Sequence, residues 1–291
     1  MKKQYFDIRN DKEAIFNYRF IQPPQIAYFV TTTDEFGNIN TTPVTLGTCN
    51  AATFPKDGNP GEFYLSFSMG TQAQNEEGNE NHPRDGYINL LNSDEVVISY
   101  IGRNILKEAI ICNMPLPRGI SELEVAGLHT FASKNIQVPS ILECPINIEC
   151  EIVERIQLGK YYMLFVAKAV GISVDKELLK KDFDGYGVLH IDPVFELNIN
   201  QDYTKNNRLH FGYIDKNRID VPGDDFGSTV DWVGTYDNFI TSEFNRGKIT
   251  KIELARIQQL TKEFKKDRSK TLIKQELTQL LAKAINSKKT I

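Results

Sequence analysis

The amino-acid sequence predicts a mainly β protein, an antiparallel β-barrel with flanking helices, followed by an α-helical C-terminal extension. Extended segments rich in β-branched and aromatic residues follow one another across short turns over most of the chain. Helices are predicted singly between strands rather than after every strand, which favours an antiparallel barrel over a doubly wound parallel sheet. From Ile249 onward, apolar residues recur at the spacing of an amphipathic helix.

The first two strands are predicted to form a hairpin. Residues 26–33 are β-branched and aromatic, and residues 34–38 contain Asp, Gly and Asn, which tolerate positive φ in a turn. Residues 39–46 then resume the extended pattern. Further strands are predicted at 62–68, 96–100, 144–156 and 161–174, and helices at 84–92 and 104–112.

The last two of these strands are the longest. Residues 144–156 alternate apolar and polar positions, and residues 161–174 are apolar enough to pair with them across the turn 157–160. We therefore expect a two-stranded ribbon with one solvent-exposed face. The polar segment 69–83 is predicted as a loop and is a candidate lid over a ligand.

The chain is predicted to divide into a barrel domain, residues 1–205, and an extension, residues 206–291. Asparagine, glycine and proline interrupt any periodicity at the start of the extension, so a loop-rich connector is expected there. Two amphipathic helices follow, with lysine-rich outer faces. Because no aromatic residues alternate with the lysines, packing against the barrel or a second subunit is favoured over a nucleic-acid-binding arm.

Composition and charge restrict the possible partners. Hydrophobic residues make up 41% and charged residues 25%, as in ordinary globular proteins. The formal net charge of −4 divides into −13 for residues 1–245 and +9 for residues 246–291, and the acidic body argues against nucleic acid as a ligand. No apolar run suggests a membrane span or secretion signal, and the four cysteines form no C-x-x-C pair. We expect a cytoplasmic protein with reduced thiols.

Several catalytic and nucleotide-binding motifs are missing from the sequence. It contains no G-x-G-x-x-G, P-loop, H-E-x-x-H or G-x-S-x-G motif. The four histidines stand far apart, so we expect no metal site.

Small hydroxyl and amide residues cluster near the predicted strands. Small side chains let a flat ligand lie against the backbone, and hydroxyls with an arginine can hold a phosphate. The alternative is that the threonines are ordinary strand residues and that Arg84 pairs with Asp85 or Glu80 on the surface. The candidate cofactor-binding residues are Thr45, Leu46, Gly47, Thr48, Asn50, Ser66, Ser68, Arg84 and Asp85.

Several segments together resemble the flavin reductase-like FMN-binding domain, the family that includes flavoredoxin. The most specific part is the E-x-E-x-A-G-L pattern at residues 122–128, followed by E-C-P at 143–145. The resemblance spans roughly residues 20 to 200 and leaves out the helical extension. The other segments that carry it are 24–33, 34–40, 42–45, 63–68, 84–85, 89–90, 115–121, 138–142 and 148–150.

The resemblance implies a split β-barrel that dimerises and holds FMN non-covalently at the subunit interface. In such proteins the strand matching residues 45–50 lies along the isoalloxazine ring. The segment matching Arg84 and Asp85, with the strand serines, serves the phosphate and the ribityl chain. The family commonly has Asp-Thr after the basic residue, whereas Gly86 follows Asp85 here. The expected phosphate hydroxyl is therefore absent, and backbone amides at Gly86 or Tyr87 could replace it.

The function implied by the resemblance is that of an FMN-binding flavoprotein oxidoreductase, a flavin reductase that uses NADH or NADPH. An FMN-bound electron carrier without its own nicotinamide turnover and a flavin-free interaction protein are the alternatives. No catalytic residue is assigned, because the flavin itself accepts the hydride. His129 and His190 could contact the flavin edge or a nicotinamide, but hydrogen-bonded structural roles are the commoner case.

Overall fold

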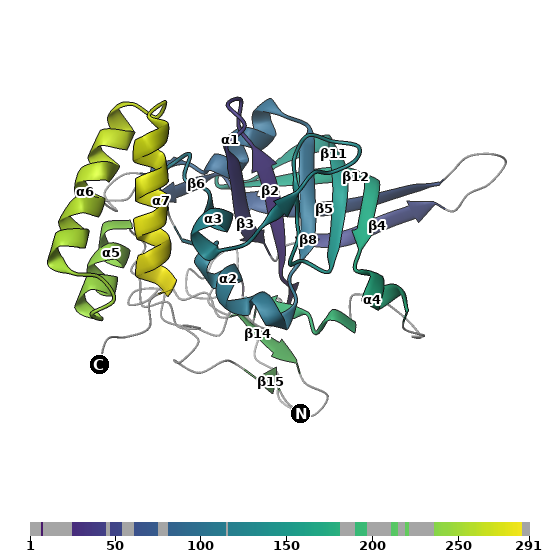
Figure 1. The fold of residues 1–291 in the computed structure, drawn as a ribbon. Helices are drawn as coiled ribbons and strands as arrows, with labels where there is room; N and C mark the ends of the chain where they lie inside the picture. Colours follow the sequence, from purple (N-terminus) through teal and green to yellow (C-terminus); the bar gives the residue numbers. More distant parts are fainter. Residues whose placement is uncertain are drawn as a thin grey trace.

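The computed structural model describes residues 7, 25–44, 47–53, 61–74, 81–114, 116–180, 190–196, 211–214, 219–220 and 236–286. Its largest element is a seven-stranded antiparallel sheet with the order β3-β2-β8-β11-β12-β5-β4 (Figure 1). The strands are β2 (Tyr28–Thr33), β3 (Ile39–Val44), β4 (Gly47–Thr53), β5 (Glu62–Gly70), β8 (Glu95–Tyr100), β11 (Ile146–Leu158) and β12 (Tyr162–Val174).

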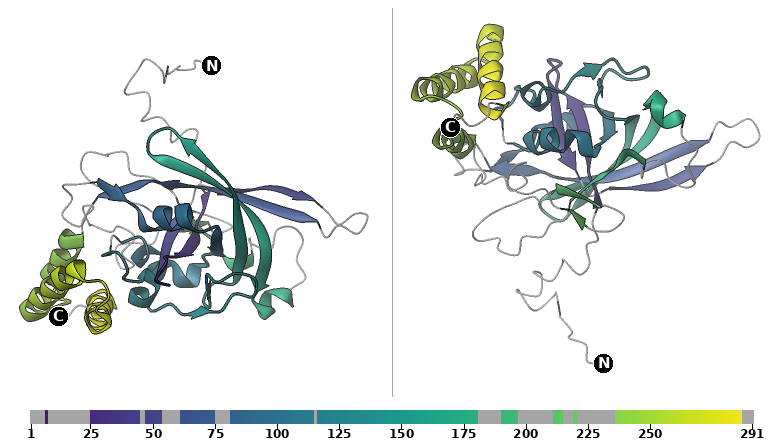
Figure 2. Two further views of the ribbon diagram at one scale, coloured as in Figure 1. Left: turned by 90° about the horizontal axis from the view of Figure 1, so that it is seen from above. Right: turned by 60° about the horizontal axis from the view of Figure 1, so that its bottom comes forward.

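The sheet is strongly curved, as in a split barrel. The long hairpin β11–β12 bends across the molecule (Figure 2), and its register shifts between Glu149 and Cys150 and again between Ile152 and Glu154. Such irregularities increase the local bend and twist of a strand. The edge strand β3 also approaches β5. The predicted mainly β, barrel-type fold is confirmed, and both strands of the predicted ribbon are present.

Three smaller sheets surround the large one. The first has the order β1-β13-β14-β15, and the others are the hairpins β6–β7 and β9–β10. The segment 69–83, predicted as a loop, thus contains a hairpin, while residues 75–80 lie outside the described residues. β13 pairs with β14, so this small sheet contains strands from both sides of the predicted domain boundary at residue 205. The boundary itself stays a prediction. The bounds are β1 (Gln25–Ile26), β6 (Gln72–Gln74), β7 (Asn81–Pro83), β9 (Thr130–Phe131), β10 (Ser140–Ile141), β13 (Val194–Glu196), β14 (Phe211–Ile214) and β15 (Ile219–Asp220).

The helices include those predicted and several that were not. The predicted helices at 84–92 and 104–112 correspond to α1 and to η2 with α2, and the two predicted tail helices are α6 and α7. α3, α4 and α5 were not anticipated. No helix in the described ranges is long and apolar enough to cross a membrane. The bounds are α1 (Asp85–Asn92), η2 (Arg103–Ile105), α2 (Leu106–Ile111), α3 (Glu122–Ala126), α4 (Lys176–Leu179), α5 (Tyr236–Asn245), α6 (Lys251–Lys266) and α7 (Thr271–Asn286).

Local signals explain where several helices begin and end. The side chain of Ser121 accepts a hydrogen bond from the backbone N–H of Glu124 and caps α3, which ends at Gly127 with a φ of 79°. Thr250 and Glu253 form a capping box at the start of α6. These short-range interactions satisfy amides and carbonyls that a helix end leaves without partners.

Alternate residues of β2 pack into two separate hydrophobic cores, because successive side chains of a strand point to opposite faces. Tyr28 and Val30 face the core inside the curved sheet, where the rings of Phe67 and Phe165 stack with their centroids 5.3 Å apart. Phe29 faces the second core, which joins the sheet to the helices.

The C-terminal helices pack onto the barrel through this second core. α7 lies against α3 (Figure 1), and buried residues from both helices share one cluster with α6. The apolar stripes of the extension are therefore covered by the same chain, in agreement with packing against the body. The buried tail residues are Ile240, Ile249, Ile257, Leu260, Phe264, Leu277, Leu281, Ala284 and Ile285.

Candidate functional site

Small residues follow Tyr64 along the outer face of β5. The alternate residues Leu65, Phe67 and Met69 belong to the core inside the sheet. Ser66 and Ser68 therefore lie on the opposite face. Both predicted serines thus share one side of the strand, and we call the surface around them on β4, β5 and β12 the serine face.

Strands β4 and β12 lie on either side of β5. Ser66 pairs with Thr48 of β4, and Gly70, on the same side of β5 as the serines, pairs with Tyr162 of β12. Tyr162 is half exposed. A planar ligand can approach the backbone closely where side chains are small, and an aromatic side chain at the border adds apolar contact area.

Arg84 lies at the end of the serine face. Its Nε donates a hydrogen bond to the carbonyl oxygen of Gln72 at 3.1 Å. A Cβ built on Gly70 would stand 3.4 Å from the same Nε, so the guanidinium passes over the glycine. The absence of a side chain at residue 70 therefore makes room for Arg84 in line with Ser66 and Ser68.

The first turn of α1 begins immediately after Arg84. Arg84 occupies the N-cap position without a side-chain cap, and within the described part of the chain the amides of Asp85, Gly86 and Tyr87 have no acceptor. Open amides and the positive end of the helix dipole make such a helix start suitable for an anion such as phosphate.

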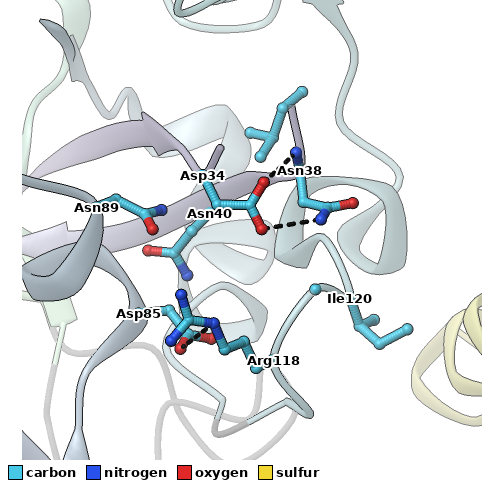
Figure 3. Close-up of a pocket in the computed structure, with 9 residues that line it drawn as sticks. Asp34, Asn38, Asn40, Asp85, Asn89, Arg118 and Ile120 are labelled. Carbon is cyan, nitrogen blue, oxygen red and sulfur yellow. Dashed lines mark hydrogen bonds and ion pairs between the residues drawn. The ribbon is translucent and has the colours of Figure 1, made fainter. Parts of the chain in front are cut away.

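A polar hollow lies beside this helix start (Figure 3). Its volume is about 10 Å³, room for about one water molecule, and it is partly open to solvent. The side chains of Asn40, Asp85 and Arg118 turn toward one another there. The hollow is too small for a flavin ring. It is lined by Asp34, Asn38, Ile39, Asn40, Asp85, Asn89, Arg118, Gly119 and Ile120.

Asp85 and Arg118 form an ion pair in the hollow, with Nε and Oδ1 3.6 Å apart. Burial raises the pKa of Asp85, and the positive charge of Arg118 opposes that shift. Among the described residues no hydrogen bond or ion pair joins Arg84 to Asp85, and Glu80, the other partner considered for Arg84, lies outside them. Arg118 therefore brings a second guanidinium to the start of α1.

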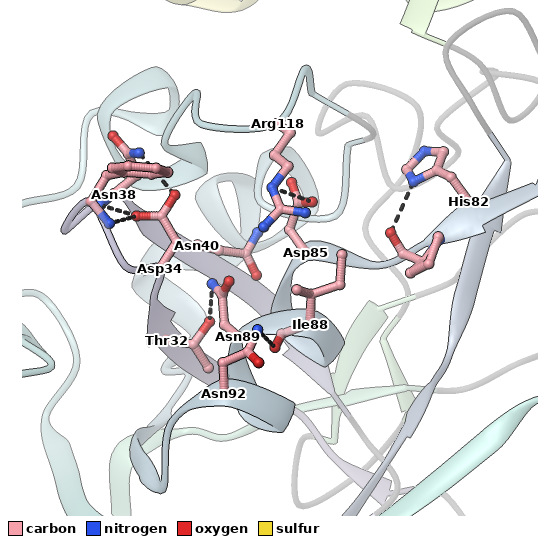
Figure 4. A network of polar contacts seen from close by, with 12 residues as sticks. Thr32, Asp34, Asn38, Asn40, His82, Asp85, Ile88, Asn89, Asn92 and Arg118 are labelled. Carbon is pink, nitrogen blue, oxygen red and sulfur yellow. Dashed lines mark hydrogen bonds and ion pairs between the residues drawn. The ribbon is translucent and has the colours of Figure 1, made fainter. Parts of the chain in front are cut away.

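Side-chain hydrogen bonds hold the walls of the hollow in place (Figure 4). Asp34 accepts hydrogen bonds from the backbone N–H and the side-chain amide of Asn38, both at 2.8 Å. Asn89, on α1, donates to the hydroxyl of Thr32 at 3.0 Å. These contacts fix the hairpin β2–β3 and α1 relative to each other.

Asn40 connects the hollow to a buried carboxyl. Its Nδ2 donates to Oε1 of Glu122 at 2.8 Å, and the backbone N–H of Thr41 donates to Oε2 at 3.0 Å. Burial raises the pKa of Glu122 to about 8. A Cβ at Gly86 would lie only 2.8 Å from Oδ1 of Asn40. The Asn40 amide thus lies against the position where the family commonly has a threonine.

The predicted site residues fall into four groups. Thr45 and Leu46 lie outside the described residues. Ser66, Ser68 and Arg84 come together along the serine face, whereas Asp85 turns into the hollow. The backbones of three others, Gly47, Thr48 and Asn50, belong to β4, with Asn50 at the register shift between Cys49 and Ala51.

Three residues beside the helix start were not among the candidates: Asn40, Arg118 and Glu122. All three stand within the segments that carry the family resemblance. Their placement depends on contacts between parts of the chain about 80 residues apart, such as Asn40 with Glu122. In the sequence, the only indication that these residues belong to a site is their position within the segments that resemble the family.

His129 has a hydrogen-bonded partner, as expected for a histidine with a structural role. Its Nδ1 lies 2.7 Å from Oε1 of Glu143, and its backbone N–H donates to the same carboxylate at 3.0 Å. His190 is exposed. Among the described residues, no group of histidine, cysteine, aspartate and glutamate side chains could hold a metal ion.

Comparison with known families identifies a flavin reductase like domain over residues 28–191, more than half of the chain. A curated relative from Aquifex aeolicus is 24% identical over 105 residues, which are 36% of this chain and 53% of the relative. One from Halalkalibacterium halodurans is 29% identical over 147 residues, which are 49% of this chain and 63% of the relative. The chain thus spans between about half and two thirds of the length of these relatives.

Solved structures share the fold at low sequence identity. Nitrilotriacetate monooxygenase component B from Bacillus cereus has a TM-score of 0.55 at 21% identity, and the match covers 67% of this chain and 92% of that one. Flavoredoxin of Desulfovibrio vulgaris (Miyazaki F) has a TM-score of 0.51 at 14% identity, with 67% and 89% covered. A Shewanella frigidimarina structure assigned as a flavin reductase with a split barrel domain has a TM-score of 0.51 at 17% identity, with 66% and 90% covered.

Proposed function

The chain belongs to the family of flavin reductase like domains, and from this premise we propose that it is an FMN-binding oxidoreductase that reduces flavin with NADH or NADPH. Residues 28–191 contain the seven strands of the large sheet and nearly all of the segments that resemble the family. The helical extension, residues 236–286, lies outside that match. The proposal therefore assigns the flavin to the barrel.

The observation that carries the proposal is the alignment of the serine face with the open start of α1. Ser66, Ser68 and Gly70 lie on one side of β5 and lead to Arg84, and the amides that have no acceptor among the described residues follow at once. This succession matches the shape of FMN, a planar ring with a polar chain that ends in a phosphate. A dianionic phosphate suits a helix start that carries an arginine.

The residues have distinct roles in this arrangement. The small side chains of Ser66 and Ser68 let the ring lie against β5, and their hydroxyls can donate to the ribityl chain. Arg84 and the amides of Gly86 and Tyr87 would hold the phosphate. Bound flavin supplies the two-electron acceptor for a hydride from nicotinamide, while the protein orients the reactants and sets the local charge.

We also propose a homodimer in the cytoplasm. The dimer is supported by the family resemblance and by exposed apolar residues on the β11–β12 hairpin, among them Val153, Ile156 and Tyr161. The apolar stripes of the extension no longer argue for it, because this chain covers them itself. Cys112, Cys144 and Cys150 are buried free thiols, which fits a reducing compartment.

Parallel titrations with FMN and riboflavin test the proposed site. The purified protein, stripped of any bound flavin, should bind both ligands and should bind FMN more tightly, since only FMN carries the phosphate. Equal dissociation constants would show that the start of α1 holds no phosphate. Failure to bind either ligand would contradict a flavin site on the serine face.

A further inference from the structure

The turn between α6 and α7 concentrates positive charge on an otherwise acidic protein. Residues 262–274 contain six lysine and arginine residues and two acidic residues, which gives a net charge of +4. Arg268 and Lys270 are exposed. One of the two acids, Asp267, accepts hydrogen bonds from the backbone and side chain of Ser269 within the turn. The turn therefore presents cations to solvent that the packing of the extension does not require.

The turn follows a residue that contacts the neighbourhood of the helix start. The ring of Phe264, at the end of α6, lies 3.6 Å from where a Cβ on Gly119 would stand. The residue before this glycine, Arg118, forms the ion pair with Asp85. Asp85 is the first residue of α1 and directly follows Arg84. Short contacts thus connect the beginning of the turn to the proposed phosphate end of the serine face.

The far end of the turn is attached to the same region. Lys274, in the first part of α7, donates a hydrogen bond to Asn38, which lines the hollow together with Asp85. Burial raises the pKa of Asp85, and positive charges that include Arg268 oppose this shift. The cations of the turn are therefore held beside the start of α1.

The barrel itself supplies almost no net charge at this place. The charged residues of the barrel around the helix start and the hollow are Arg84, Arg118, Asp34, Glu35 and Asp85. Glu122, buried behind Asn40, adds little negative charge at neutral pH, because burial raises its pKa to about 8. The turn between α6 and α7 therefore decides the sign of the local field.

We propose that the α6–α7 turn attracts the phosphate of FMN electrostatically and speeds its arrival at the start of α1. FMN is mostly a dianion at neutral pH, since the second pKa of a phosphate monoester is about 6. The turn needs no direct contact with the ligand, because charges act over roughly 8 Å at physiological salt and roughly 30 Å at about 0.01 M. This inference rests on the proposed function and assigns the extension a part in it.

The response to salt has opposite signs for the turn and for the whole protein. The formal net charge is −4, so the protein as a whole repels a dianion, and added salt would speed FMN association by screening that repulsion. If the turn governs the encounter, salt screens an attraction and FMN association becomes slower. Riboflavin is uncharged, so salt should change its association rate little.

A pair of double variants isolates the position of the charge. Arg268→Gln with Lys270→Gln removes two exposed cations from the turn. Lys176→Gln with Lys251→Gln removes two exposed cations elsewhere and is the matched control, because the net charge changes equally. Lys176 begins α4, on the opposite side of the molecule from α6 and α7 (Figure 1). Lys251 begins α6, whose other end leads into the turn.

The experiment measures association rates of FMN and riboflavin with the flavin-free full chain by stopped-flow fluorescence. Salt is raised from about 0.01 M to about 0.15 M. The wild-type rate for FMN should fall with salt. At the lowest salt the turn variant should bind FMN roughly threefold to tenfold more slowly than the wild type, and the control variant at nearly the wild-type rate. Riboflavin rates should be the same in all three proteins.

Several outcomes would overturn this role of the turn while leaving the flavin site intact. They are a wild-type FMN rate that rises with salt, an unchanged rate in the turn variant, and equal losses in both variants. Each would show that the turn is only a solvated helix surface. If the wild type binds neither FMN nor riboflavin, the proposed function is wrong as well.

Discussion

Nζ of Lys274 donates a hydrogen bond to Oδ1 of Asn38 at 2.7 Å, joining α7 to the turn between β2 and β3. Asn38 in turn donates to Asp34 at the edge of the polar hollow. The Phe264 ring, on α6, lies 3.6 Å from where a Cβ would stand on Gly119, which also lines the hollow. The extension outside the family match therefore contacts two of the residues that line the hollow.

We predict that the extension and the barrel unfold as one unit. Leu281 is fully buried in the shared core, so Leu281→Ala should lower the free energy of unfolding by about 2–5 kcal/mol. Leu272, on the same helix and 80% exposed, gives the control, and Leu272→Ala should change stability by less than about 0.5 kcal/mol. Urea unfolding monitored by circular dichroism measures both. Two separate transitions, with only one shifted by Leu281→Ala, would show that the extension folds independently.

Arg84→Ala should weaken FMN binding selectively. A hydrogen bond to a charged group contributes about 1.5–3 kcal/mol, which corresponds to a loss of roughly tenfold to a hundredfold in affinity. Riboflavin binding should hardly change, because Arg84 stands at the phosphate end of the serine face. Fluorescence titration of both ligands measures the effect. If both dissociation constants stay at the wild-type values, Arg84 only anchors the β6 backbone.

Gly86 and Asn40 should be energetically coupled. Gly→Ala inside a helix normally stabilises it by up to about 1 kcal/mol. Here the new Cβ would meet Oδ1 of Asn40 at 2.8 Å, so Gly86→Ala should destabilise the protein. In an Asn40→Ala background the same change should be neutral or stabilising, giving a coupling of about 0.5–3 kcal/mol. If the changes in the free energy of unfolding are strictly additive in this double-mutant cycle, the two residues do not interact.

Glu122 should make stability fall as the pH rises. Burial raises its folded pKa to about 8, above the ordinary 4.5, so the native state holds the proton more tightly than the unfolded chain between these values. The stabilisation that Glu122 contributes is complete below pH 4.5 and is lost as the pH rises toward 8. Over this range the free energy of unfolding falls by up to about 1.4 kcal/mol per pH unit. Urea unfolding between pH 5 and pH 8 should show a flatter profile for Glu122→Gln. Parallel profiles would contradict the raised pKa.

The fold was largely predictable because its signals are local. Alternation along residues 144–156 and 161–174 identified the long hairpin, and the apolar stripes identified α6 and α7. α3 was missed because five residues give too little periodicity, although Ser121 and Gly127 mark its two ends. The hairpin β6–β7 was missed because its strands have only three residues each.

The candidate site was less predictable, since its contacts join distant segments. The sequence could select Ser66, Ser68 and Arg84 as candidate contacts for a flavin, which stays a prediction, but nothing in it shows that Asp85 pairs with Arg118. Three acidic residues of the family-like segments have a role that motif matching does not reveal, because each accepts a backbone N–H from another segment of the chain. Glu122 holds Thr41, Glu143 holds His129, and Glu149 holds Lys134 and Asn135.

The central claim is that this chain binds FMN and passes electrons to it from a nicotinamide. The most direct test is to add NADH or NADPH, without oxygen, to the protein loaded with FMN and to follow the visible flavin absorbance. We predict that at least one nucleotide bleaches the bound flavin within seconds and that added free FMN sustains turnover. If dithionite bleaches the flavin while neither nucleotide does, the protein is an electron carrier and the reductase assignment is wrong.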